Sequence, residues 1–297
     1  MKNIHVFLFS LVLIISFGNH SLKAQINEID FIKGGIDDAQ SLFQAYLEPY
    51  GNIFGANLNG GWYNTAKVHK LGGFDVTVTL NTAFAPPSAR TVDLSQLGLD
   101  ATINGDPVAP TVAGKKAEAR PELVYYQDFE GNSIELAKYT VPNGTGVRMI
   151  PLPMGQVGIG LPFGTEITAR YLPTLNFKDY GNVGLWGVGG KHSILQHIPG
   201  LKHLPILDIT AQGGYTKLRT TANVDFGADK YTPANINDID PQLFYDQKIE
   251  LTASAWTVNL ITSQTLPVIT FYQGIGYSNS TVELGLNGNY PFPSIAT

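Results

Sequence analysis

Apolar and polar side chains alternate along the segment GFDVTVTLNTAF, which covers residues 73–84. From Phe74 to Asn81 every even-numbered position is apolar and every odd-numbered position is polar. A period of two predicts a β-strand with one apolar and one polar face. In a soluble sandwich the apolar face would pack on a second sheet, whereas in an outer-membrane barrel it would face lipid around a wet interior.

Four later segments repeat this alternation and predict further strands: residues 155–173, 206–215, 248–255 and 281–290. A tight turn at Pro162–Gly164 connects two of the strands, while other connections are long, at 85–150 and 220–246. Short turns at one end and long loops at the other are typical of outer-membrane barrels. The pattern therefore predicts an all-β fold, an antiparallel outer-membrane β-barrel over residues 72–297, rather than a sandwich.

Three local features need separate interpretation. The apolar phase of residues 248–255 reverses at Trp256, which indicates either a β-bulge or the edge of the apolar band. Residues 85–121 are rich in proline and lack periodicity, so we expect a long loop there. The stretch 122–139 is compatible with a short hairpin centred on Glu130–Asn132.

The first 24 residues resemble a secretory signal peptide in their layout. Lys2 precedes an apolar run from Val6 to Phe17, and a polar stretch leads to an expected cleavage site near Ala24. An uncleaved membrane anchor is the alternative, although the apolar run is short for a spanning helix. We therefore expect export to the outer membrane.

Residues 25–71 are expected to form a short helical segment that partly plugs the barrel. Apolar positions from Ile36 to Leu47 recur at helical spacing, and two aspartates suit the positive end of the helix. Pro49 is expected to end the helix. A stretch rich in glycine and asparagine then leads to the first strand.

The composition narrows the possible functions. Only 14% of the residues are charged, against about 25% in typical soluble domains, which favours a membrane location. A net charge of −5 without a basic cluster argues against a nucleic-acid partner. The chain has no cysteine, which excludes disulfides and thiolate chemistry. It also lacks the motifs of serine hydrolases and zinc proteases, so we expect neither an enzyme nor a cofactor.

Two groups of potential metal ligands favour a structural interpretation. His192, His197 and His203 do not share one helical face, and Pro199 breaks their segment, so an amphipathic connector at the periplasmic interface is favoured. The aspartates of residues 220–246 lack the regular spacing of a calcium loop, which favours a solvated loop. We expect no metal site.

Five ionisable residues on the polar strand faces are the candidate functional residues: Glu166, Arg170, Asp208, Glu250 and Glu283. In a barrel these faces line the lumen, where charges set the selectivity of passage. The alternative is that the charges pair with one another and make a narrow barrel rigid.

Three stretches carry a resemblance to a known group of proteins: AYLEPYGNIFGANLNGGWYNTAKVHKLGGFDVTVTLN, LPFGTEITARYLP and KHSILQHIPGLKHLPILDITAQGGYT. Over most of residues 36–290 the chain resembles a family of uncharacterised Gram-negative outer-membrane β-barrel proteins, distantly similar to the long-chain fatty-acid transporter barrels. The resemblance implies a barrel fold and no particular substrate or site residue. Such barrels end in a strand with a terminal aromatic residue, whereas this chain ends in YPFPSIAT, so we expect a barrel that is incomplete at its C-terminus.

These observations predict a channel or transporter for small hydrophobic solutes. The apolar face of the plug needs an apolar partner, which suggests a hydrophobic pocket beside it. A non-transporting barrel that serves adhesion or envelope structure is the alternative. In either case the expected partners are outer-membrane lipid and the barrel-assembly machinery.

Overall fold

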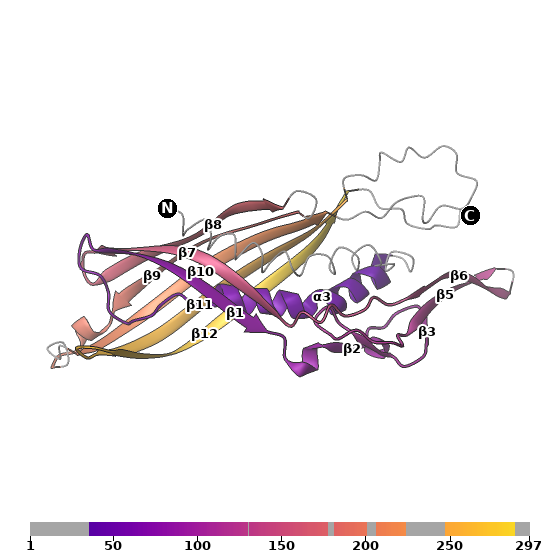
Figure 1. The fold of residues 1–297 in the computed structure, drawn as a ribbon, viewed down its shortest axis with the longest axis horizontal. Helices are drawn as coiled ribbons and strands as arrows, with labels where there is room; N and C mark the ends of the chain where they lie inside the picture. The colour runs from indigo at the N-terminus through magenta and orange to yellow at the C-terminus, as the bar shows by residue number, and fades with distance from the viewer. Residues whose placement is uncertain (1–35, 130, 178–180, 201–205, 224–246, 289–297) are drawn as a thin grey trace.

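The computed structural model describes residues 36–288, except 130, 178–180, 201–205 and 224–246. A curled antiparallel sheet, one long helix within its curve and a smaller β-rich unit at one end make up this part of the chain (Figure 1). The expected signal peptide, His203 and the aspartates of 224–246 lie outside the described residues.

Seven long strands form the curled sheet: β1 (Phe74–Phe84), β7 (Met149–Leu161), β8 (Thr165–Phe177), β9 (Gly181–Ser193), β10 (Leu207–Asn223), β11 (Lys248–Thr265) and β12 (Thr270–Asn287). They lie in the order β1-β7-β8-β9-β10-β11-β12, and every neighbouring pair is antiparallel. The sheet is a half-barrel, in which β1 and β12 are the edge strands of the described part. The antiparallel β architecture predicted from the alternation is confirmed.

The outer, convex face of the half-barrel carries an exposed apolar band. Val78 of β1 is 69% exposed and Ile275 of β12 is 77% exposed. The surface continues across neighbouring strands, because Val76 is opposite Val157, and Val157 is opposite Ala169. No second sheet covers this face in the described part of the chain, which excludes the sandwich arrangement there.

The inner, concave face changes its chemistry along the strands. At one end it is apolar, where Leu152, Leu218 and Leu251 are buried in a cluster with the C-terminal end of the helix. At the other end it is polar, and Glu166 and Gln212 are buried there. The half-barrel therefore has an apolar and a polar inner region, whereas the alternation placed only polar side chains of the strands on the inner face.

The reversal of the apolar–polar alternation at Trp256 is not caused by a β-bulge. The pairing of β11 with β10 and with β12 is continuous through this residue. Trp256 and Val258 are exposed on the outer face, and every second residue back to Glu250 lies on the same face. The reversal thus marks the edge of the outer apolar band, which is one of the two interpretations that the sequence left open.

The helix α3 (Ile36–Asn59) is longer than the sequence predicted. Pro49 lies inside it and does not end it, which corrects the expected stop. Proline removes one N–H donor, and the burial of Ile53 and Leu58, which are 2% and 0% exposed, offsets that loss. No helix in the described residues, α3 included, is long and apolar enough to cross a membrane.

Two glycines let the second half of α3 approach β12 closely. A Cβ atom at Gly51 would lie 3.3 Å from Val282, and one at Gly55 would lie 2.7 Å from the Cβ of Ser280. Glycine is unfavourable within a helix by about 1 kcal/mol relative to alanine. The close packing against the sheet explains why a glycine-rich stretch is nevertheless helical.

A folded unit of short strands packs on the N-terminal half of α3, where the sequence predicted a long loop over residues 85–121. Its elements are η2 (Pro87–Ala89), β2 (Thr91–Asp93), η3 (Leu94–Gln96), β3 (Thr102–Asn104), β4 (Val108–Pro110), β5 (Glu122–Phe129) and β6 (Asn132–Thr140). Leu94, Val112 and Leu123 share a core with Phe43 of the helix. The strands β2, β3 and β4 have three residues each, too few to produce a recognisable alternation. The sequence pattern therefore did not predict them.

Two contacts define how this unit is built. The predicted hairpin is confirmed, because β5 and β6 are antiparallel and Phe129 pairs with Asn132 across the turn. The carboxylate of Asp38, in the first turn of α3, accepts a hydrogen bond from the backbone N–H of Asp100 at 3.0 Å. Burial raises the pKa of Asp38 above its ordinary value.

Candidate functional site

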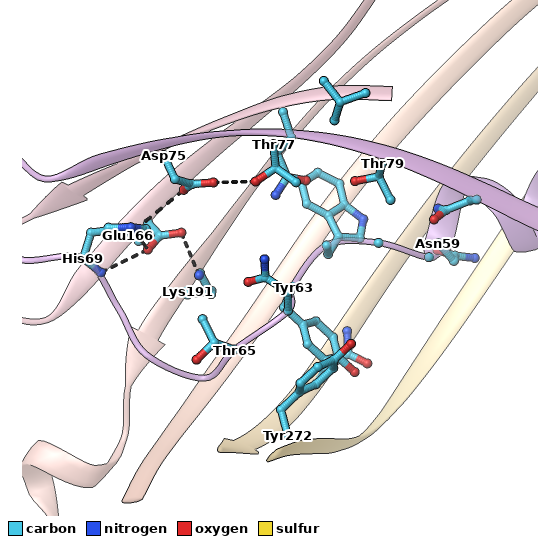
Figure 2. A pocket seen from close by; sticks show the side chains of 18 residues that line it. Asn59, Tyr63, Thr65, His69, Asp75, Thr77, Thr79, Glu166, Lys191 and Tyr272 are labelled. Carbon is cyan, nitrogen blue, oxygen red and sulfur yellow. Dashed lines mark hydrogen bonds and ion pairs between the residues drawn. The ribbon is translucent and has the colours of Figure 1, made fainter. Parts of the chain in front are cut away.

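A pocket of about 730 Å³ lies at the polar end of the inner face (Figure 2). Its walls come from the inner side of β1, from β7, β8 and β9, from β11 and β12, from Asn59 at the end of α3 and from residues 60–65 that follow it. The segment between the helix and the first strand therefore enters the half-barrel and lines its interior, as a plug would.

Trp62, three residues after the end of α3, sits in a socket made by glycines. It is 3% exposed. Gly189 and Gly214 are opposite each other in β9 and β10, and a Cβ atom at Gly189 would lie 2.6 Å from the indole ring. A Cβ atom at Gly214 would also overlap the ring. The lack of a side chain at these two glycines therefore leaves room for the indole ring. Neither glycine lies in a turn.

Arg170 fastens the C-terminal end of α3 to the sheet. Its guanidinium donates to the carbonyl oxygens of Leu58 at 3.0 Å and Gly60 at 2.8 Å. It also lies 3.6 Å from the centroid of the Trp62 ring. A cation at this position satisfies carbonyl groups that a helix end leaves free, and it offsets the negative end of the helix dipole.

A buried ion pair anchors the next part of the segment. Glu166 is opposite Lys191 across β8 and β9, and their side chains are 2.8 Å apart at Oε1 and Nζ. The other oxygen of Glu166 lies 2.7 Å from Nδ1 of His69 and accepts the backbone N–H of His69 at 3.1 Å. Glu166 thus holds both the strand pair and the segment before β1.

Asp75 completes a charged cluster at one end of the pocket. Its Oδ1 lies 3.7 Å from Nδ1 of His69, and its Oδ2 accepts a hydrogen bond from the Thr77 hydroxyl at 2.8 Å. Gly158 is opposite Asp75 in β7. A Cβ atom there would overlap Asp75 and lie 3.1 Å from Oε1 of Glu166. The missing side chain is what lets the two carboxylates lie close together.

The rest of the pocket wall is mostly amide and hydroxyl groups. Asn81 donates to the Asn57 carbonyl at 2.7 Å, and Asn259 donates to Gln212 at 2.6 Å. Tyr63 and Tyr272 meet edge to face with ring centroids 6.1 Å apart, away from the charged cluster (Figure 2). Neutral hydrogen-bonding groups beside aromatic rings suit an uncharged polar ligand.

Three of the five predicted site residues lie on the inner face. Glu166 lines the pocket, and Arg170 lies beneath Trp62. Asp208 has the same phase in β10 as Thr210 and Gln212, which are buried on the inner face. The structure brings Glu166 and Arg170 to the same region, and Asp208 is not among the residues that line the pocket.

Glu250 and Glu283 lie on the outer face, which corrects the prediction that they line the lumen. Their neighbours Leu251 and Leu284 pack on the inner apolar cluster, so the two glutamates point the other way. Glu250 pairs with Arg219 at 2.6 Å. The inner region at this end contacts α3 and is apolar. The polar positions of the alternation therefore lie on the outer face there.

The sequence did not single out His69, Asp75, Lys191 or Trp62. Asp75 could have been found, because it lies on the polar side of the first predicted strand. His69 lies in an irregular segment, and no pattern indicates which strand it will meet. Lys191 is recognisable only from the cross-strand register that places it opposite Glu166.

His192 and His197 meet at the end of β9, where the short helix η4 (Leu195–His197) follows. Their Nε2 atoms are 3.2 Å apart, and Nδ1 of His192 is 2.9 Å from the Thr165 hydroxyl. Both nitrogens of His192 are therefore within hydrogen-bonding distance of partners. This arrangement supports the structural interpretation of these two histidines as part of a connector.

Comparisons with known proteins give one match. No curated protein and no solved structure matches the chain. Residues 1–296 match the family described as "Family of unknown function (DUF6588)". The match covers nearly the whole sequence, and the protein is therefore a member of the DUF6588 family.

Proposed function

We propose that this protein is an outer-membrane β-barrel protein whose half-barrel is the lipid-facing wall, and that it acts as a channel or transporter for a small polar solute. The observation that carries the proposal is the inverted arrangement of the sheet, with an exposed apolar outer face and a buried polar inner region. Soluble β-proteins bury the apolar face instead.

A row of aromatic residues on the outer face supports contact with a bilayer. Tyr171 is opposite Trp186, and the Trp186 ring lies 5.8 Å from that of Tyr215. Tyr215 is opposite Trp256, whose ring lies 5.5 Å from that of Tyr277. Each strand from β8 to β12 thus contributes one ring. Tyrosine and tryptophan are enriched where a membrane meets water.

The pocket favours a polar solute over a hydrophobic one. A hydrophobic solute was expected because the apolar face of the plug helix needed an apolar partner. The strands supply that partner themselves, through Leu152, Leu218 and Leu251 around Leu58. The remaining space is lined by amides, hydroxyls and charged groups, which hydrogen-bond sugars and other polyhydroxylated molecules well.

A non-transporting role in adhesion or envelope structure is the second candidate function. It is favoured by the way α3 is fixed, because buried Arg170 holds the end of the helix with hydrogen bonds to Leu58 and Gly60. A helix held in this way would keep the interior closed. The unit of β2 to β6 at the end of the half-barrel would then be the part that is displayed (Figure 1).

A liposome-swelling assay tests the transport proposal. The full-length protein would be reconstituted into phosphatidylcholine vesicles, which are then diluted into arabinose or into the much larger stachyose. Arabinose should enter faster than into protein-free vesicles, and stachyose should not. Thr77→Trp fills the pocket from the inner side of β1 and should at least halve the rate. Thr82→Trp, on the exposed side of the same strand, is the matched control and should leave the rate unchanged.

Two results would overturn the transport role. One is an arabinose rate in assembled wild-type protein equal to that of protein-free vesicles, which would leave the non-transporting role. The other is an equal loss of rate in both tryptophan variants, because the pocket would then not be the route.

A further inference from the structure

Three side chains with metal-binding chemistry converge in the wall of the pocket. His69, Asp75 and Glu166 each offer one ligand atom, and these three atoms all lie within 4.8 Å of one another. They come from the segment before β1, from β1 and from β8. Figure 2 draws the three side chains together at one end of the pocket.

We propose that these three residues bind a divalent transition-metal ion, with its remaining coordination positions open to the pocket. The site needs only the fold of the inner face, so the proposal stands independently of the membrane location and of solute passage.

The spacing of the ligand atoms suits such an ion after a small adjustment. Nδ1 of His69 is 2.7 Å from Oε2 of Glu166 and 3.7 Å from Oδ1 of Asp75. Adjacent ligands of an octahedral ion with bonds of about 2.1 Å are roughly 3 Å apart. The two observed distances bracket this value.

The outer oxygen of each carboxylate is held by another group. The Thr77 hydroxyl donates to Oδ2 of Asp75, and Lys191 contacts Oε1 of Glu166, both at 2.8 Å. Metal-binding carboxylates are usually held in this way by partners behind them. The oxygen that faces His69 remains the one directed toward the proposed ion.

The charges and ligand types select the class of ion. Two carboxylates and one lysine give a net charge of −1 when His69 is neutral, which favours a cation. One imidazole with two carboxylates suits Mn²⁺, Fe²⁺, Co²⁺ or Zn²⁺ better than Ca²⁺, which prefers oxygen ligands alone. Lys191 reduces the affinity, because its ammonium group repels the bound ion.

Nδ1 of His69 must give up its hydrogen bond with Glu166 when it binds an ion. Only two donors can account for the 2.7 Å approach of His69 and Glu166, namely a protonated imidazole nitrogen or a protonated carboxyl. An ion at Nδ1 takes the place of this proton, which a neutral imidazole can carry on Nε2 instead. The pocket provides the access, because His69 and Asp75 are each about one-third exposed.

Titration with Co²⁺ tests the proposal, because bound cobalt has visible absorption bands that report its ligands. The purified full-length protein in detergent should bind one equivalent of Co²⁺. Asp75→Asn removes one ligand charge and leaves the contacts of Glu166 with Lys191 and His69 in place. It should weaken binding at least tenfold, whereas Glu283→Gln on the outer face should not change it. Lys191→Met should strengthen binding.

The alternative is that the cluster only anchors the segment before β1. Absence of stoichiometric cobalt binding by the folded wild-type protein would overturn the metal site. Equal affinity of wild type and Asp75→Asn would overturn it as well, and so would equal weakening by Glu283→Gln. A Lys191→Met variant that folds but binds cobalt more weakly would contradict the charge argument and with it the proposed site.

Discussion

One buried guanidinium connects the C-terminal end of α3 to the sheet. Arg170 is 2% exposed and contacts two backbone carbonyls, the Gln156 side chain and the ring of Trp62. A buried charge is costly unless its hydrogen bonds are satisfied. The geometry therefore depends on the planar fork of arginine, which lysine does not have.

Replacing this residue should loosen the end of α3. Arg170→Lys keeps the charge but cannot reach both carbonyls and stack on the indole, and the loss of buried hydrogen bonds costs about 1–3 kcal/mol. We expect that decrease in the free energy of unfolding, measured by denaturant titration in detergent. Arg219→Lys, whose side chain is 67% exposed in its pair with Glu250, should leave stability unchanged. Equal effects of both substitutions would mean that Arg170 is no anchor.

Alternation predicted which residues turn inward where the inner region is polar. Glu166, Arg170 and Asp208 were assigned correctly to the inner face on this basis. Their partners could not be predicted, because Arg170 binds backbone carbonyls, which leave no trace in the sequence. For Glu250 and Glu283 the rule failed, since it assumes that the interior is polar along the whole strand.

At the scale of elements, the packing of α3 against β12 determines where glycine is needed. Gly55→Ala should raise helix propensity by about 1 kcal/mol, but its Cβ would lie 2.7 Å from that of Ser280. Overpacking of this kind costs about 1–3 kcal/mol, so we expect a net loss of stability in denaturant titration. The double variant Gly55→Ala with Ser280→Gly should recover it. Failure of the second change to restore stability would show that the contact is not the cause.

A substitution on the outer face of β1 tests whether lipid or water surrounds this face. Arginine at Val78 would place a charge in the apolar band, and in a bilayer this costs about 2–4 kcal/mol near the midplane. We expect Val78→Arg to reduce the fraction of protein that folds into vesicles, as measured by heat-modifiable migration on gels. Glu283→Arg, on the outer face beyond the apolar band, should fold as the wild type does.

Equal folding of the two arginine variants would mean that the apolar face does not meet lipid.

The apolar band itself was predicted from the alternation, since the strands were recognised from a local period. The helix end and the unit at residues 85–121 could not be predicted, because both depend on contacts between segments that are far apart in sequence. Leu94 and Leu123, for example, become core residues only by meeting α3.

At the scale of the molecule, the three tryptophans lie on opposite faces of the sheet, so their fluorescence can test its orientation. Trp62 is enclosed on the inner face, whereas Trp186 and Trp256 are 49% and 43% exposed on the outer face. In vesicles of brominated phosphatidylcholine, lipid contact should quench most of the wild-type fluorescence. The variant Trp186→Phe with Trp256→Phe retains only Trp62 and should be quenched little. Equal fractional quenching in both proteins would contradict the proposed orientation of the wall.

The direction of the two edge strands limits how such a wall can close. Six antiparallel pairings separate β1 from β12, so the two strands run the same way. An all-antiparallel closure must therefore insert an odd number of strands between them. One added to the seven would give an eight-stranded barrel, whose interior is only wide enough for side chains. An α-helix with its side chains is about 10–12 Å wide. A closed barrel that encloses α3 would thus need three or more additional strands, and the helix would set its minimum circumference.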